Sequence, residues 1–370
     1  MPAPERSPAA AGGRMRAWAE LLRVSALFTV PGDALAGTAA TGRRPDRGTA
    51  YAVGASLCLY EAGMALNDWA DRDEDAVDRP HRPLPSGRIT PAAALGAAGL
   101  LTAAGLALAS RAGRPALTVA TALAGTVWAY DLRLKHTAAA PAVMATARAL
   151  DLALGATATG PAPRAGRRPA ATVPIRHALD LAPGATATAS APTGHPAGRR
   201  PDAAVRGGAP RRAPDLVAGA PVTGRGTAAR TALRVAAPAA ALAAHTYAVT
   251  AVSRHETQGG STLVPLAALA ATAALGAFTG LGALRTSGGA AALVPLLPAA
   301  GYIGTAAVPL LHAALNPSPP LTQRAVGGGI RAMIPLQAAL AARAGAGGTG
   351  IAVLGLAPLA RTLARKVSPT

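Results

Sequence analysis

The sequence predicts an all-α, polytopic membrane protein with about nine transmembrane helices around a central cavity. Only 14% of the 370 residues are charged and 51% are hydrophobic, whereas a soluble globular chain has roughly 25% charged residues. Two stretches, 262–284 and 286–323, contain no Asp, Glu, Lys or Arg, and roughly 20 helical residues are enough to cross the hydrocarbon core. The 42 glycines and the aromatic content of only 3% suit close contacts between helices in lipid.

The individual helices follow from apolar runs that end at charged, Pro-rich or Gly-rich breaks. The first run follows Arg14 and Arg16 as in a signal peptide, but Glu20, Arg23 and Asp33 interrupt it, so we expect a retained helix. The second run ends at an acidic stretch, and RAGR separates the third from the fourth. YDLRLKHT ends the fourth, RHETQGGS ends the sixth, and NPSPP ends the eighth. The predicted helices are 18–41, 48–66, 90–110, 115–130, 138–157, 231–252, 262–284, 288–314 and 326–343, and 349–364 is either a tenth helix or the second half of a broken ninth.

A long segment between the fifth and sixth helices, about 158–230, differs from the rest of the chain. It is rich in Pro, Gly and Ala, and holds eleven Arg and three Asp between residues 160 and 230. The sequence ALDLALGATATG from Ala149 recurs as ALDLAPGATATA from Ala178, with Pro inside the second copy. We therefore interpret 158–230 as a repeat-containing, disordered or weakly ordered insert. It divides one helical membrane domain into two halves, 1–157 and 231–370.

The net charge of +19 would indicate a nucleic-acid partner in a soluble protein. Here the arginines lie mainly between apolar runs, so we exclude nucleic acid and expect membrane lipids and anionic ligands as partners. With nine spans, the N-terminus and the loops after the second, fourth, sixth and eighth helices share one face. Short segments of this face carry eleven Lys and Arg against six on the other, which predicts a multi-pass protein of the cytoplasmic membrane with the acidic stretch in the cytoplasm. The bias toward Ala, Arg and Gly, with only two lysines, indicates a bacterial source.

The acidic stretch begins with NDWADRDEDAVD at Asn67 and places six carboxylates in eleven residues of a chain that has 17. On a helix, Asp68, Asp71 and Asp75 lie within about 60° of one another, because their spacing is i, i+3, i+7. Three carboxylates on one helical face repel each other, and a single charge at the bilayer centre costs about 2.5–3.5 kcal/mol. A cation must offset them.

The residues that follow suggest which cation and which ligand. Mg²⁺ prefers oxygen ligands, and shares its coordination shell with substrate phosphates. The guanidinium groups of Arg79 and Arg82 match phosphate oxygens. The stretch therefore predicts a magnesium diphosphate site at a membrane surface. The alternative is a solvated loop whose carboxylates pair with its own arginines.

The same stretch resembles the first aspartate motif of the UbiA superfamily of membrane prenyltransferases, Asn-Asp-x-x-Asp-x-x-x-Asp followed by Arg-x-x-Arg-Pro-Leu-x-x-Gly. The resemblance extends to the nine-helix layout, to YDLRLKHT and to RHETQGGSTLVPL, and leaves only the insert foreign. It implies Mg²⁺-dependent transfer of a prenyl group from a prenyl diphosphate to an aromatic or other lipophilic acceptor. The matching positions are Asn67, Asp68, Asp71, Asp75, Arg79, Arg82, Pro83, Leu84 and Gly87.

Family membership implies a role for each matching residue. The implied catalytic residues are Asp68, Asp71, Asp75 and Lys135, the last of which resembles the family's diphosphate-binding lysine. The implied metal ligands are Asn67, Asp68, Asp71 and Asp75, with Glu256 as a candidate in the second motif. The diphosphate would be bound by Arg79, Arg82 and Lys135, with Arg254 as a further candidate. Tyr130, next to Asp131, is a candidate on the acceptor side.

The second motif departs from the family pattern. Family members typically place two or more aspartates after the sixth helix, whereas this chain offers Arg254, His255, Glu256 and Gln258. A single carboxylate holds a second metal weakly, so Arg254 or a protonated His255 would instead neutralise the diphosphate directly. For His255, an interfacial position with no chemistry is the alternative. The departure keeps two other functions open: a non-enzymatic binding or transport protein with this fold, and a terpene cyclase that uses the same ionisation.

Two carboxylates lie inside apolar runs, Asp33 in the first helix and Asp151 in the fifth. Ionisable residues within the membrane are functional candidates, because burying them is costly. We expect Asp33 and Asp151 to face the cavity and contact the acceptor. The alternative for either residue is a structural pair between helices; in the sequence, Asp151 is paired with Arg148, three residues before it.

Overall fold

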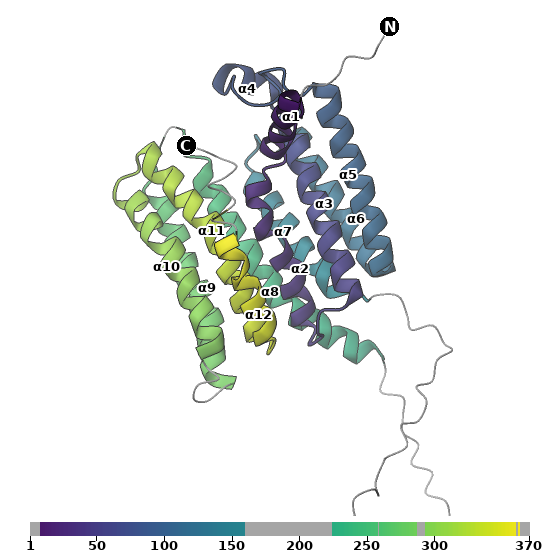
Figure 1. Cartoon of the computed structure of the whole chain (residues 1–370). Coiled ribbons are helices and arrows are strands. Elements are labelled where there is room, and N and C mark those ends of the chain that lie inside the picture. The colour runs from purple at the N-terminus through teal and green to yellow at the C-terminus, as the bar shows by residue number, and fades with distance from the viewer. Residues whose placement is uncertain (1–7, 160–223, 258, 287–292, 360–361, 363–370) are drawn as a thin grey trace, which may run out of the picture. The chain divides into compact units, whose positions relative to one another are not determined.

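The computed structural model describes residues 8–159, 224–257, 259–286, 293–359 and 362, and helices are the only regular elements in these ranges. Backbone contacts group residues 1–162 with 225–370 as one unit and 163–224 as another. The first unit contains all the elements shown in Figure 1. Most of the predicted insert, 158–230, lies outside the described residues, so its disorder stays a prediction.

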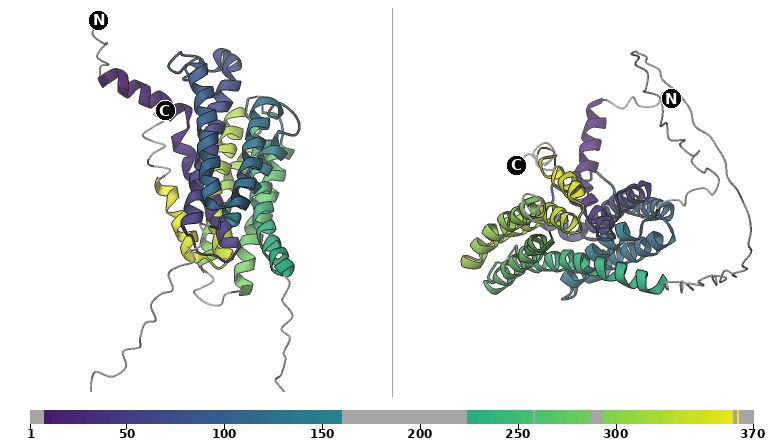
Figure 2. Two further views of the ribbon diagram at one scale, coloured as in Figure 1. Left: turned by 90° about the vertical axis from the view of Figure 1, so that its right-hand side faces the viewer. Right: turned by 90° about the horizontal axis from the view of Figure 1, so that it is seen from below.

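The N-terminal half of the first unit has seven α-helices and two short turns of other helix types. They are α1 Pro8–Leu21, η1 Val24–Thr29, α2 Pro31–Ala40, α3 Arg47–Ala70, α4 Arg72–Asp78, α5 Pro91–Ala112, α6 Arg114–Ala129, the π-turn η2 Tyr130–Leu134 and α7 Ala140–Thr157. The C-terminal half has α8 Gly224–Ser253, α9 Leu263–Thr286, α10 Leu293–Leu315, α11 Pro319–Arg343 and α12 Gly347–Leu354. The all-α prediction is confirmed, and the two halves pack side by side through α2 and α11 (Figure 2).

Local sequence explains where the helices begin. Asp46 and Thr49 form a capping box at the start of α3, in which Asp46 accepts the Thr49 backbone N–H at 2.9 Å and Thr49 Oγ1 accepts the Asp46 backbone N–H at 3.2 Å. At the start of α5, Thr90 caps the Ala93 backbone N–H and Pro91 follows at the first helical position. The cap at Thr90 places the start of α5 after the acidic stretch, whose first residues, Asn67 and Asp68, belong to the last turn of α3.

The first predicted helix, 18–41, is wrong as a continuous element. The chain breaks at Arg23, whose φ of 48° and ψ of 46° put it in the left-handed region, and α2 starts afresh with Pro31 at its first position. Proline suits the first position of a helix, because it has no backbone N–H and its φ is already fixed near the helical value. The last run also divides: Gly345 has a φ of 85° and separates α12 from α11.

Five helical segments in the described ranges are long and apolar enough to cross a membrane: Pro91–Ala112, Ala229–Ser253, Leu263–Leu281, Val294–Leu315 and Pro319–Arg343. Several large apolar side chains on their surfaces are exposed, including Leu100, Leu266 and Leu297, as is expected where lipid replaces water. The remaining long helices are shorter or carry charges: α6 has 16 residues, and α7 holds Arg148 and Asp151. The chain is a multi-pass membrane protein.

Glycines allow α2 and α7 to approach closely. A side chain at Gly155 would collide with the Ala34 backbone, and one at Gly37 would collide with the Leu152 backbone. Thr38 Oγ1 also donates a hydrogen bond to the Gly155 carbonyl at 3.0 Å. Small residues at a helix interface permit such contact in lipid, and this contact fixes the depth at which α2 and α7 present their buried charges.

Four loops and the end of α1 gather at one end of the unit. Lys135, after α6, forms an ion pair with Asp71 after α3, and Arg254, after α8, donates to the Thr137 carbonyl at 2.6 Å. Gly260 N–H donates to the Pro317 carbonyl at 3.0 Å, which joins the loops before α9 and α11. Arg88 forms an ion pair with Glu20 of α1 at 2.7 Å. The predicted sharing of one face is therefore confirmed, while the cytoplasmic assignment stays a prediction.

Candidate functional site

Two aspartates of the first motif, residues 67–87, converge on one guanidinium. Asp68, in the last turn of α3, is 4% exposed and lies 3.5 Å from Arg82 Nη1. Asp75, in α4, is 2% exposed and binds the same nitrogen at 2.7 Å. Arg79 Nη1 lies 3.5 Å from the other oxygen of Asp75. Arg82 thus lies between two buried carboxylates, which is an arrangement expected of a cation site and of a phosphate-binding guanidinium.

Asp71 lies at the junction between α3 and α4 and faces a different partner. The predicted stripe of three aspartates assumed one continuous helix, but α3 ends at Ala70 and α4 begins at Arg72, with Asp71 between them. Its carboxylate pairs with Lys135 Nζ, and Lys135 is 9% exposed.

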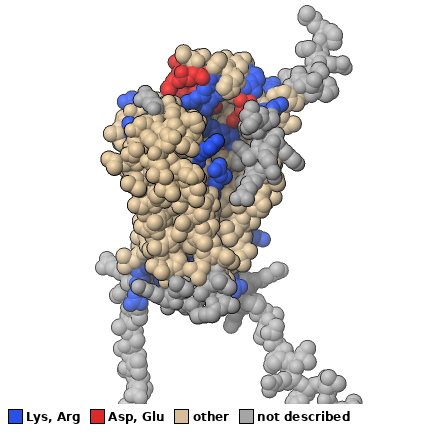
Figure 3. Space-filling model, turned by 90° about the vertical axis from the view of Figure 1, so that its left-hand side faces the viewer, with Lys and Arg blue, Asp and Glu red and all other residues tan. Residues whose placement is uncertain are grey.

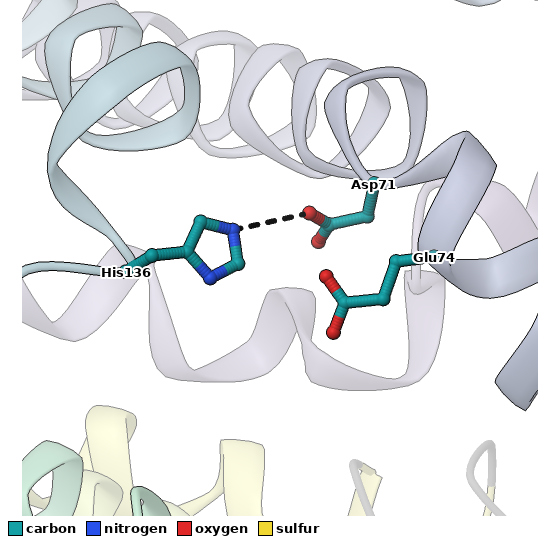
Figure 4. A group of neighbouring side chains, drawn as sticks. All are labelled: Asp71, Glu74 and His136. Atoms are coloured by element: carbon teal, nitrogen blue, oxygen red, sulfur yellow. Dashed lines mark ion pairs between the residues drawn. The ribbon is translucent and has the colours of Figure 1, made fainter.

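A second group of potential ligands surrounds Asp71. Figure 4 shows Glu74 and His136 pointing toward it, and His136 Nε2 lies 3.9 Å from Asp71 Oδ1. One ligand atom from each of these three residues lies within 4.8 Å of the others. Glu74 and His136 are exposed, whereas Asp68 and Asp75 are buried, so the buried pair is the better-defined half of the acidic cluster.

A cavity of about 240 Å³ opens beside the first motif. Its outer part is polar: Asn67 Nδ2 donates to Asp131 Oδ1 at 3.2 Å, and Tyr130 and Arg23 also line it. Its walls are apolar, with Leu59, Met64, Leu123, Val127, Met144 and Ala147 among the lining residues. The cavity lies between α3, α6 and α7, in the N-terminal half of the unit.

A second hollow, an open groove of about 830 Å³ between α7, α8 and α9, has no charged residue in its lining. It cannot neutralise a diphosphate, so the smaller cavity is the candidate site. Figure 3 shows acidic and basic side chains gathered at one end of the unit, above a largely apolar surface, with basic side chains continuing into a hollow below.

The loop after α8 approaches the first motif but does not complete it. Glu256 is half-buried, and burial raises the pKa of its carboxyl, while the positive charge of Arg79 opposes that shift. Arg79, which acts on Glu256, also pairs with Asp75 at 3.5 Å. Arg254 is tied to the loop after α6 through the Thr137 carbonyl. Arg254 and Glu256 thus lie at the same end of the unit as the first motif, with Glu256 beside Arg79.

The inner end of the cavity contains buried charges. Asp33 is fully buried and pairs with Arg148 across the α2–α7 contact, and Gln337 of α11 donates to Asp33 Oδ1 at 2.7 Å. Asp151 is 6% exposed and lines the cavity together with Arg148 and Ser56. In the sequence, Arg148 lies three residues before Asp151, but its ion pair is with Asp33, because α2 and α7 cross where both side chains lie. For Asp33, this is the structural pair between helices that the sequence left open as the alternative.

Sequence reasoning gave no role to Arg23. Its Nη2 lies 3.1 Å from Asp68 Oδ1, and its side chain lines the cavity. It is the only residue other than glycine with positive φ in the described part of the chain, and such a conformation costs about 1–2 kcal/mol. Strained backbone of this kind clusters at functional sites. The signal in the sequence was a charge that interrupts an apolar run shortly before Pro31.

The donor set of the first motif fits a magnesium ion. Asp68 and Asp75 point carboxylate oxygens at the same Arg82 nitrogen, at 3.5 and 2.7 Å, so a cation replacing that nitrogen would have both oxygens within reach. Oxygen ligands from one or two carboxylates, completed by phosphate and water, are what Mg²⁺ takes in proteins. Asp71 and the amide of Asn67 flank this pair on the same turn of chain.

Comparison with known proteins points to one family. Residues 25–189 match the model of the UbiA prenyltransferase family. This part of the chain, a little under half of it, is similar to UbiA prenyltransferases. This match includes the first motif, Lys135 and the whole of the cavity lining except Arg23, and it confirms the resemblance on which the site residues were chosen.

Several of the proteins that this chain resembles are archaeal. It is 36% identical over 128 residues to a digeranylgeranylglyceryl phosphate synthase of Methanopyrus kandleri, which covers 33% of this chain and 45% of the relative. A solved UbiA homologue of Archaeoglobus fulgidus bound to GPP and Mg²⁺ has a TM-score of 0.52 at 16% identity, covering 92% of this chain and 99% of the other. An apo UbiA homologue of Aeropyrum pernix has a TM-score of 0.53 at 16% identity, with coverages of 87% and 96%.

The structural likeness shows that the UbiA fold extends over both halves of the helical unit. The sequence likeness is shorter: the chain spans less than half the length of the curated relatives it matches.

Proposed function

We propose that this protein transfers a prenyl group from a prenyl diphosphate to a lipophilic or aromatic acceptor, with Mg²⁺ as its cofactor. The observation that supports this most strongly is the convergence of Asp68 and Asp75 on Arg82, beside the Asp71–Lys135 pair, at the polar mouth of an otherwise apolar cavity. A diphosphate needs cations, and a prenyl chain needs an apolar wall. Both are present within one site.

Each group of residues at the site would have a separate role in this reaction. Asn67, Asp68, Asp71 and Asp75 would hold the metal, which lowers the barrier to ionisation by stabilising the negative charge of the leaving diphosphate. Lys135, Arg79, Arg82 and Arg254 would bind diphosphate oxygens that the metal leaves free. On binding, Arg82 turns from the two carboxylates to the phosphate. Glu256 is a further metal ligand in this proposal, although Arg79 lies beside it.

The reaction breaks the bond between the allylic carbon and the diphosphate oxygen, and the electron pair leaves with the diphosphate. The acceptor forms a new bond to that carbon and loses a proton to solvent, so the products are the prenylated acceptor, diphosphate and one proton. Leu59, Val127 and the other apolar side chains of the wall exclude water, which protects the carbocation-like group from hydrolysis. No nucleophilic side chain is required.

The acceptor and the orientation belong to this proposal as well. Several relatives are named digeranylgeranylglyceryl phosphate synthase, so a glyceryl phosphate lipid is one acceptor to test beside aromatic ones. Tyr130 lines the cavity at its polar end, and Asp151 at its inner end. We place the site on the cytoplasmic face, because the short loops at this end carry the excess of Lys and Arg.

One observation favours a second candidate function, a carrier or sensor of prenyl diphosphates. The second motif supplies only one carboxylate, Glu256, and a single carboxylate holds a second metal weakly. Such a site would bind the diphosphate without ionising it efficiently. Binding without turnover distinguishes this function from transfer.

The test is product formation in membranes that contain the full chain. Radiolabelled geranyl, farnesyl and geranylgeranyl diphosphates would be incubated with Mg²⁺ and a panel of acceptors, using wild type, Asp71→Ala and Glu256→Ala. We expect labelled lipophilic product in the wild type and none in Asp71→Ala. Loss in Glu256→Ala would show that the reduced second motif still acts. Tight binding with no product in any sample would favour the carrier. If the protein neither binds the diphosphates nor forms product, the acidic stretch is a solvated loop.

A further inference from the structure

The end of α3 and the π-turn η2 meet through two pairs of side chains. Asn67 Nδ2 donates to Asp131 Oδ1 at 3.2 Å, and Lys135 Nζ forms an ion pair with Asp71. On each segment the two residues are four positions apart. The Lys135 backbone N–H donates to the Tyr130 carbonyl at 3.0 Å, which closes the π-turn. Such turns are frequent at functional sites, and this one brings a carboxylate and an ammonium group to the first motif.

Asp131 is a buried carboxylate that has no part in the reaction proposed above. It is 4% exposed. Gly63 leaves room for it on α3, because a side chain there would lie 3.0 Å from Val127 Cγ1 and 3.9 Å from Asp131 Oδ2. Burying a carboxylate is costly, and a buried serine or asparagine would accept the same hydrogen bond at a smaller cost. The charge of Asp131 therefore indicates a role beyond the hydrogen bond itself.

An ionised carboxylate restricts the orientation of the amide that it contacts. It accepts hydrogen bonds and donates none, so Asn67 can bind Asp131 only through its NH₂ group. The amide oxygen of Asn67 is then turned away from Asp131 and is available for a cation. A serine or asparagine in place of Asp131 would have both a donor and an acceptor, and would therefore permit either orientation of the amide.

Asn67 shares a helical face with Asp71, another ligand of the proposed metal site. The Asp71 backbone N–H donates to the Asn67 backbone carbonyl at 2.9 Å, so the helical turn is intact between them. Side chains four residues apart on a helix have Cβ atoms roughly 5–6 Å apart, and Asn67 also lines the cavity. One cation can therefore bind the Asn67 amide oxygen and the Asp71 carboxylate. With the amide reversed, the NH₂ group would face a metal that requires oxygen ligands.

We propose that Asp131 is a positioning residue, which holds the Asn67 amide with its oxygen turned toward the metal. The proposal rests on the proposed Mg²⁺-dependent prenyl transfer, because it takes Asn67 as a metal ligand. Asp131 does not touch the metal and acts through its hydrogen bond to Asn67. Removing the hydrogen-bonding partner of a metal ligand typically weakens metal binding by about 10–100-fold.

Binding of Mn²⁺ alone tests this role without any turnover. Mn²⁺ takes oxygen ligands as Mg²⁺ does, and the electron paramagnetic resonance signal of the free ion gives its dissociation constant. The full chain would be placed in nanodiscs of neutral lipid, with Mn²⁺ bound to protein-free nanodiscs subtracted. The pH would be 8, because burial raises the pKa of Asp131 to about 7.

Substitutions of Asp131 should weaken Mn²⁺ binding in a fixed order. Asp131→Leu should raise the dissociation constant about tenfold or more. Asp131→Asn keeps the shape of the side chain, and should raise it by a smaller factor; it provides the measurement if the leucine variant fails to fold. Asp131→Glu keeps a group that only accepts hydrogen bonds, and should recover part of the affinity. Asp73→Leu is the matched control: Asp73 belongs to the same acidic stretch, its side chain is 89% exposed, and its loss should change the dissociation constant by no more than about twofold.

A double-mutant cycle shows whether Asp131 acts through Asn67. Asn67→Ala should weaken Mn²⁺ binding by a factor similar to that of Asp131→Leu. Adding Asp131→Leu to Asn67→Ala should then change the dissociation constant by no more than about threefold, because the amide that Asp131 orients is already absent. If Asp131 acts instead by its charge, through Lys135 or as a ligand itself, the two losses multiply.

Equal dissociation constants for wild type and Asp131→Leu would overturn the positioning role, and so would losses that multiply in the double variant. Release of diphosphate from geranyl diphosphate, measured with Mg²⁺ on the same preparations, tests the proposed function separately. Release together with Mn²⁺ binding that does not depend on Asp131 overturns the positioning role alone. Mn²⁺ binding that depends on Asp131 through Asn67, without release, supports the positioning role and overturns the enzymatic function. Absence of Mn²⁺ binding by wild type overturns both.

Discussion

Arg82 bridges two buried carboxylates, so its removal should destabilise the protein in a way that Mg²⁺ reverses. Arg82→Met keeps the apolar stem of the side chain and removes the charge. At an effective dielectric of about 20, unit charges 2.7 and 3.5 Å apart attract by about 6 and 5 kcal/mol. Much of this is offset by desolvation, and removing one member of a buried pair costs about 3–5 kcal/mol in practice.

We expect the destabilisation caused by Arg82→Met to lie near or below the lower end of that range. The Arg82 side chain is 21% exposed, and each carboxylate retains another partner: Arg23 lies 3.1 Å from Asp68, nearer than Arg82 does, and Arg79 lies 3.5 Å from Asp75. We therefore expect a loss of about 2–3 kcal/mol in free energy of unfolding without Mg²⁺. At roughly 2–4 °C per kcal/mol, the unfolding midpoint falls by about 5 °C or more.

The assay is thermal unfolding in detergent micelles, followed by tryptophan fluorescence with EDTA or with saturating Mg²⁺. Mg²⁺ should recover most of the loss, because it supplies the cation that the two carboxylates lack. Arg88→Met is the matched control: Arg88 pairs with Glu20 on the surface, both side chains being 38% exposed, and such pairs contribute about 0–1 kcal/mol. A loss in Arg82→Met no larger than in Arg88→Met, or one that Mg²⁺ does not reduce, would refute the reasoning.

Three further substitutions test other parts of the site and the fold. Lys135→Met should lower kcat/KM for the prenyl diphosphate by about tenfold to hundredfold, since a hydrogen bond to a charged group contributes about 1.5–3 kcal/mol. Steady-state release of diphosphate measures this kcat/KM. The control is Arg133→Met, which changes an exposed arginine in the same turn and should leave kcat/KM within about twofold of the wild-type value. Arg254→Gln should raise KM for the diphosphate more than it lowers kcat, and a change confined to kcat would contradict its assignment to ground-state binding. Gly155→Ala should reduce the yield of folded protein, because the new side chain would collide with the α2 backbone. The control is Gly99→Ala, which has open space around it and should be neutral or stabilising by up to about 1 kcal/mol. Equal yields of the two variants in size-exclusion chromatography would count against the close α2–α7 contact.

The fold could be predicted where a single local signal decides it. Uninterrupted apolar runs marked α5, α9 and α10 to within a few residues, because length and lack of charge are enough to define a membrane helix. The break at Arg23 was not predicted. It depends on a left-handed residue held by Asp68, 45 positions later, and a contact of that range leaves no local pattern.

The candidate site shows the same division. The spacing of Asp68, Asp71 and Asp75 suggested a shared face, and their chemistry suggested a diphosphate, both from sequence alone. Sequence could not show that Asp71 turns to Lys135 while the other two share Arg82. That arrangement depends on the helix break at Asp71 and on where the loop after α6 returns, and both are properties of packing.

The inner end of the cavity could be predicted from the sequence only in part. Asp33 and Asp151 were conspicuous as charges inside apolar runs, but Ser56 was not, since a serine in an apolar helix is common. The exchange of partners at Arg148, from its sequence neighbour to Asp33, follows from the glycine contact between α2 and α7.

The central claim is that the acidic cluster binds a prenyl diphosphate together with Mg²⁺. The most direct measurement is equilibrium binding of geranyl diphosphate to the purified full chain, with Mg²⁺ or EDTA, for wild type and Asp71→Asn. The account predicts binding that requires Mg²⁺ and that weakens by at least about tenfold in Asp71→Asn. Binding of equal strength in EDTA, or unchanged in Asp71→Asn, would contradict it.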